Sequence, residues 1–278
     1  SGTNGNIVLS TSSGDITGLA TVNAGSGNVT LNSAGAIVDD GSSGTVITGG
    51  VLTADAAGAI TIDSTVTSAN ISTSAAGAVD LDETDAITLT DVDTNDGSIT
   101  VDAGGLITAT DVVASGGSGD SVTLSTTTGG AVATLVTGAD AVSITANAGD
   151  ITIGSVTATA GTLGVTATAG SINDAADDNT ADFTAGGLIT LTAQDEIGVL
   201  GSGSDLDLEF AAGSSVNVST TGTGAIDLDG LGALTLSDVD TVNGAITASS
   251  AGALTVTDVA SGTNGNIVLS TSSGDITG

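Results

Sequence analysis

The chain has 278 residues, with 32 acidic side chains and no lysine, arginine or histidine, so its formal net charge is −32. Cysteine, methionine, tryptophan, tyrosine and proline are also absent. Without histidine, cysteine or lysine there is no ordinary pairing of a nucleophile with a base, and without basic side chains nothing can neutralise the phosphates of nucleic acid or of an anionic membrane. No apolar run approaches the roughly 18 residues needed to span a bilayer. We therefore expect no enzymatic activity, no nucleic-acid partner and no membrane insertion.

The first 18 residues, SGTNGNIVLSTSSGDITG, occur again without a change at residues 261–278. This identity indicates a period of 260 residues, of which the chain holds one copy and the start of the next. A shorter period lies within it, because Gly-x-apolar openings (with Asp195 in place of one glycine) recur every 18–28 residues and divide the period into 12 units. The units begin at Gly14, Gly35, Gly58, Gly77, Gly105, Gly130, Gly149, Gly170, Asp195, Gly213, Gly232 and Gly252.

Apolar and polar residues alternate within the units, as in Ile60-Thr-Ile62, Ile151-Thr-Ile153 and Leu234-Thr-Leu236. Alternation with a period of two predicts β-strands with one apolar face, and the Gly, Ser, Asn and Asp between them favour turns. A unit of about 20 residues cannot bury its own apolar face, so successive units must stack. We predict an all-β fold, a single-stranded parallel β-solenoid of right-handed β-helix type that runs continuously through residues 1–278.

Units such as GAITIDSTVTS, GDITIGSVTATAG and GALTLSDVDTVNGAIT resemble the coils of filamentous-haemagglutinin-like proteins and related giant repetitive bacterial surface adhesins. The resemblance implies secretion to the cell surface and a role as an extracellular fibre, adhesin stalk or biofilm-matrix scaffold. In such a fibre the stacked coils would provide reach and rigidity.

The open ends of a solenoid and its charge indicate the partners. Each terminal coil exposes unpaired strands, so we expect neighbouring repeats of the same protein to stack end to end. Twelve coils at a spacing of about 4.8 Å rise roughly 58 Å, which places about one carboxylate on every 1.9 Å of axis, close to the charge density of DNA. We therefore expect lateral bundling of fibres through bridging cations.

The run Asp91-Val-Asp93-Thr-Asn95-Asp96-Gly97 places four oxygen-bearing side chains within seven residues. It approaches the calcium-loop pattern D-x-[DN]-x-[DN]-G, with the glycine one residue late, and calcium prefers such clustered oxygens. We predict a metal site at Asp91, Asp93, Asn95 and Asp96. The alternative is a solvated acidic turn. No cofactor is required on either interpretation, and calcium or another divalent cation is the expected ion.

A second acidic segment, with Asp174, Asp177, Asp178 and Asp182, crowds a polar insertion in the unit from Gly170. We predict a metal site at Asp174, Asp177 and Asp178, and the alternative is a solvated bulge. The long unit from Gly77 holds an additional strand-like stretch at residues 78–82, expected as an outward hairpin or a widened coil. These insertions support an alternative function, in which a ligand- or calcium-binding adhesin module displays acidic loops to a receptor, surface or mineral.

Overall fold

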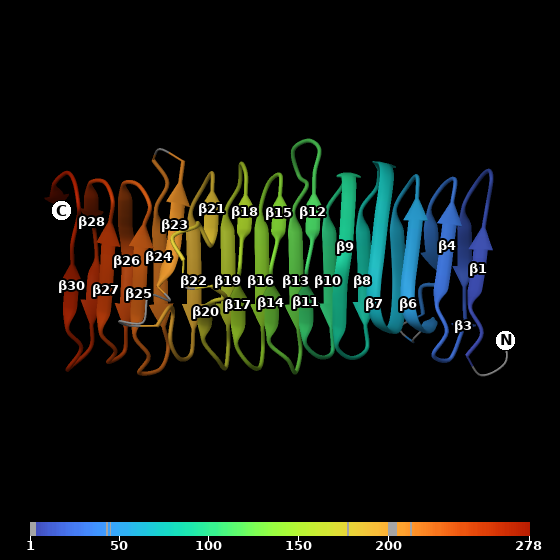
Figure 1. Cartoon of the computed structure of the whole chain (residues 1–278), viewed down its shortest axis with the longest axis horizontal. Helices are drawn as coiled ribbons and strands as arrows, with labels where there is room; N and C mark the ends of the chain where they lie inside the picture. Colours follow the sequence, from blue (N-terminus) through green and yellow to red (C-terminus); the bar gives the residue numbers. More distant parts are fainter. Residues whose placement is uncertain (1–3, 43, 45, 177, 200–204, 212) are drawn as a thin grey trace.

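The computed structural model describes residues 4–42, 44, 46–176, 178–199, 205–211 and 213–278. These residues form one sheet of 31 strands, in which all the paired strands are parallel. The sheet winds into a β-solenoid of about 12 turns, with the N-terminal turn at one end of the long axis and the C-terminal turn at the other (Figure 1). Within the described ranges there is no helix that could cross a membrane. The predicted all-β parallel solenoid is confirmed.

The strands in chain order are β1 (Ile7–Ser10), β2 (Ile16–Leu19), β3 (Val22–Asn23), β4 (Val29–Ser33), β5 (Ile37–Asp39), β6 (Ile47–Ala56), β7 (Ile60–Ala76), β8 (Val79–Glu83), β9 (Ile87–Asp96), β10 (Ile99–Ala103), β11 (Ile107–Ala109), β12 (Val112–Ala114), β13 (Val122–Thr126), β14 (Ala131–Ala133), β15 (Val136–Gly138), β16 (Val142–Ala146), β17 (Ile151–Ile153), β18 (Val156–Ala158), β19 (Leu163–Ala167), β20 (Ile172–Asp174), β21 (Phe183–Ala185), β22 (Ile189–Ala193), β23 (Leu206–Phe210), β24 (Val216–Thr220), β25 (Ile226–Gly230), β26 (Leu234–Thr241), β27 (Ile246–Ser250), β28 (Leu254–Val256), β29 (Val259–Ser261), β30 (Ile267–Leu269) and β31 (Ile276–Thr277).

Each turn passes through two walls. In the turn that starts at β10, the short strands β11 and β12 belong to what we call the first wall, and the five-residue strand β10 belongs to the second wall. In the next turn β13 pairs with β10, β14 with β11, and β15 with β12, all in parallel. A strand therefore meets its equivalent from the next turn, as the repeat pattern requires.

The core is a set of apolar columns that run along the solenoid axis. Ile99, Val122, Val142 and Leu163 pair in succession on the second wall, and all four are buried. Complete burial of one such side chain stabilises the fold by about 1.5–3 kcal/mol. Because every inward position repeats in each turn, mainly aliphatic residues fill this thin interior, and Phe183 is the one buried aromatic residue among those described.

The glycines that open the units do not all precede strands of the same wall. Gly77 precedes β8 of the second wall, whereas Gly105 precedes β11 of the first wall, so the long unit between them covers more than one turn. The stretch expected as an outward hairpin or widened coil is β8 itself, which pairs in parallel with both β7 and β10. That expectation is wrong, because Val79 and Leu81 face the core and β8 is an ordinary strand of the wall.

Buried hydroxyl groups close several corners between the walls. The Oγ1 atoms of Thr126, Thr220 and Thr241 donate hydrogen bonds to the carbonyl oxygens of Gly129, Gly224 and Gly244, at 2.5, 3.0 and 2.8 Å. All three threonines end an inward-facing row of apolar residues and are buried. These bonds satisfy carbonyl groups at the corners, where the backbone leaves the strand ladder.

We expect Gly97→Ala to destabilise the protein by about 1–3 kcal/mol. A Cβ atom at Gly97 would lie within 2.5 Å of the carbonyl carbon of Gly77, one turn away, so the stacked backbones would have to separate. Gly164→Ala is the matched control, because a Cβ atom there meets nothing within 4 Å and should stabilise by about 0.4–1 kcal/mol. Urea unfolding measures both, and equal effects would contradict the close stacking at Gly97.

Candidate functional site

The duplicated sequence returns to the same walls after 12 turns. One row of the first wall follows the order β1, β4, β6, β7, β9, β11, β14, β17, β20, Ile197, β25, β27 and β30. Between β9 and β25 the same wall has a second row, which follows β12, β15, β18, β21 and β23. The second wall follows β2, β5, β7, β8, β10, β13, β16, β19, β22, β24, β26, β28 and β31. The copied segments in β1 and β30 thus lie at the two ends of one ladder (Figure 1), and those in β2 and β31 lie at the two ends of the other.

The two copies differ in what covers them. Ile16 pairs with Ile37 of the following turn and is 8% exposed, whereas its copy Ile276 is 49% exposed. Ile267, the copy of Ile7, is likewise exposed at 43%. The last turn therefore presents apolar side chains and unpaired strand edges of the kind that a following turn covers elsewhere in the molecule.

Parallel stacking also brings carboxylates from different turns together. Asp82 pairs with Asp63 on one side and with Asp102 on the other, and the backbone N–H of Asp63 donates to Asp39 Oδ2 at 3.1 Å. Burial, together with the charges of Asp39 and Asp82, raises the pKa of the Asp63 carboxyl. Like charges stacked in this way repel one another, so a proton or a cation from solution would stabilise the column.

A shallow groove of about 360 Å³ opens beside this column and includes Asp63, Asp82, Asp102 and Glu83 in its lining. Glu83 is buried, and its Oε2 accepts hydrogen bonds from the Ser64 hydroxyl at 2.6 Å and the Val66 N–H at 3.1 Å. Burial raises the pKa of Glu83. Because donors of the chain already hold Glu83, it acts as a structural acceptor at this corner.

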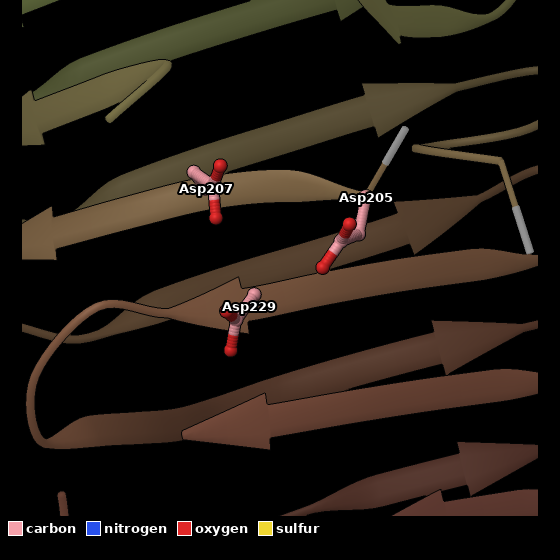
Figure 2. Close-up of side chains that lie close together, drawn as sticks. All are labelled: Asp205, Asp207 and Asp229. Carbon is pink, nitrogen blue, oxygen red and sulfur yellow. The ribbon is translucent and has the colours of Figure 1, made fainter. Parts of the chain in front are cut away.

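The tightest group of carboxylates lies at the other end of the chain. Asp207 of β23 pairs with Asp229 of β25, and Asp205 directly precedes β23 (Figure 2). Ligand oxygens of these three residues lie within 4.8 Å of one another, and no other set of three does so in the part of the chain that the structure describes. Asp207 lies between the inward-facing Leu206 and Leu208, so its own side chain is on the outer face of the strand. It is nevertheless only 3% exposed. Burial, followed by the charges of Asp205 and Asp229, raises its pKa to about 7.

Two further carboxylates adjoin this group. Asp182 is buried, and its Oδ2 accepts the backbone N–H of Asp207 at 2.9 Å. Burial is the main cause that raises the pKa of Asp182 to about 8, and the nearby Asp174 adds to it. Carboxylates from three successive turns therefore meet at one place on the surface of the first wall.

The residues of the first predicted metal site lie along β9. Asp91 and Asp93 flank the buried Val92, and the Asn70 amide donates to Asp91 Oδ2 at 3.3 Å. The Asp93 side chain is exposed, but partial desolvation at the wall, followed by the charges of Asp91 and Asp111, raises its pKa to about 6. Asn95 and Asp96 follow at the exposed end of the strand. The run is therefore extended, and calcium binding there stays a prediction.

The second predicted metal site is divided. Asp174 ends β20 beside Asp182, Asp178 is exposed and accepts the N–H of Thr180 at 2.7 Å, and Asp177 lies outside the described residues. The charges of Asp174 and Asp178 contribute to the raised pKa of Asp207. Calcium binding by these residues also stays a prediction.

No pattern considered in the sequence predicted a site at Asp205, Asp207 and Asp229. Their common feature is the pair of Asp-x-Asp runs, one at 205–207 and one at 227–229, which stand 22 residues apart, about one turn of the solenoid. Comparison of the chain with protein-family models, with curated proteins and with solved structures finds no match. The residues themselves therefore carry the functional argument.

Proposed function

We propose that this chain is a structural repeat of a secreted fibre, filament or adhesin stalk, in which stacked β-coils provide length and rigidity outside the cell. The observation that carries the proposal is the return of the duplicated sequence to the same two ladders after 12 turns. A following copy would cover Ile276 with its own counterpart of Ile37. Stacking of this kind lengthens the rod without widening it.

Tandem proteins with one, two and three copies of the 260-residue period test the proposal. We expect small-angle X-ray scattering to show that the maximum dimension grows by about 58 Å per copy while the cross-sectional radius stays constant. A cross-section that grows with copy number would mean that the repeats pack side by side, and it would overturn the end-to-end arrangement.

A substitution at the junction gives the matched control. Ile276→Asp should change the stability of the present chain little, because Ile276 is half exposed. In the two-copy protein the same position lies inside the continuous stack, and an unpaired carboxylate there should destabilise the junction and expose it to proteolysis. Equal tolerance in both proteins would contradict a continuous solenoid.

A further inference from the structure

We propose that Asp205, Asp207 and Asp229 form a binding site for one divalent cation of the calcium class, shared by two successive turns of the solenoid. The proposal concerns a ligand that the fibre function does not require. A negative result for the ion site would therefore leave the proposed fibre function unaffected, and the reverse is also true.

The spacing of the three carboxylates suits such an ion. Calcium binds its oxygen ligands at 2.3–2.6 Å, so two ligands on opposite sides of one ion lie about 5 Å apart. The ligand oxygens of Asp205, Asp207 and Asp229 all lie within 4.8 Å of one another and come from two paired segments (Figure 2). Three carboxylates supply up to six oxygens, and water completes the six to eight ligands that calcium takes.

The Asp207 side chain provides a second, independent observation. It is 3% exposed, and none of the described residues donates a hydrogen bond to its carboxylate oxygens. A buried carboxylate without a donor is costly, and proteins usually compensate it with a basic partner. This chain has no lysine, arginine or histidine, so only a proton or an ion from solution can neutralise Asp207.

The local fold gives the ion a structural consequence. Next to β23, the row of the first wall that contains β20 and β25 has no strand between them among the described residues, and only the isolated bridges Ile172–Ile197 and Ile197–Ile226 connect the turns there. An ion held by Asp207 of β23 and Asp229 of β25 would join these two turns beside the part of the wall that only isolated bridges connect. Ser249, one turn further on, donates its hydroxyl to Asp229 and orients that carboxylate.

To test the site, the full chain is first freed of metal with EDTA. Binding of Mn²⁺ to it is then measured by electron paramagnetic resonance, with Ca²⁺ as the competitor. At an ionic strength of about 0.15 M, which screens loose association with the surface charge, we expect one saturable ion per chain. Asp207→Asn should weaken its binding by about tenfold or more, whereas Asp195→Asn, which removes an exposed carboxylate outside the group, should not.

Asp207→Asn removes a buried charge and should therefore leave the ion-free protein at least as stable as before, while it abolishes the rise in melting temperature caused by Ca²⁺. The absence of saturable binding would overturn the proposal. Retention of the ion by Asp207→Asn would also overturn it, and so would an equal loss in Asp195→Asn, which would indicate diffuse condensation on the surface.

Discussion

We expect that lowering the pH from about 8.5 to about 5.5 raises the melting temperature of the ion-free protein by roughly 5–10 °C. The carboxyls chiefly responsible are the buried Asp182 and Asp207, whose pKa values of about 8 and about 7 lie far above the roughly 3.9 of aspartate in an unfolded chain. The exposed Asp93, with a pKa of about 6, contributes less because solvent screens it. Between pH 4 and 8 the folded state holds protons that the unfolded chain has released. Stability is therefore fully present below the unfolded pKa and is lost as the pH rises through the folded values.

Screening by solvent limits how much protonation of these carboxyls stabilises the folded state. These carboxyls lie in the wall of a thin rod, so screening reduces their combined contribution to about 2–4 kcal/mol. The high net negative charge acts in the same direction, because protonation also lowers the repulsion along the axis. Acidification thus stabilises this fold over a range in which many proteins change little.

Calorimetric scans of the wild type and of Asp182→Asn/Asp207→Asn at several pH values measure the effect. The double variant should melt higher than the wild type at about pH 8.5, and its melting temperature should depend less on pH. Asp195→Asn controls for the loss of charge alone. A wild-type melting temperature that falls on acidification would show that these carboxyls are ionised in the folded protein.

Residue alternation was sufficient to predict the architecture. Ile60 and Ile62, and likewise Leu234 and Leu236, were expected inside, and all four are buried. The glycine openings predicted 12 units, and the solenoid has about 12 turns. They did not show which wall each glycine precedes, since these glycines precede strands of both walls, and β8 was misjudged for this reason.

The site was harder to predict because its residues are neighbours in space and distant in sequence. The predicted metal residues were contiguous runs, such as Asp91–Asp96, whose side chains spread along an extended strand. In a parallel solenoid the neighbour of a residue is its equivalent one turn away, as Asp207 is of Asp229. Finding that pair from sequence requires the local turn length, which varies most around Ile197, where strand pairing gives way to isolated bridges.

Phe183→Ala should destabilise the protein by about 3–5 kcal/mol. Phe183 is completely buried and occupies a column of the first wall, where it pairs with Val156 on one side and with Leu208 on the other. The stacked backbones hold their spacing, so the cavity left by the ring cannot collapse, and its lining loses dispersion contacts. Phe183→Leu keeps most of the volume and should recover a large part of the loss.

Phe210 provides the matched control, because it is the other aromatic residue of the chain and is only partly buried at the edge of the core. Phe210→Ala should cost clearly less than Phe183→Ala in chemical unfolding. Hydrogen exchange adds the spatial test. Because each turn contacts only its neighbours, the loss of protection in Phe183→Ala should centre on β18, β21 and β23 and fade toward the two ends of the rod. A uniform loss along the chain would show that the solenoid unfolds as a single cooperative unit.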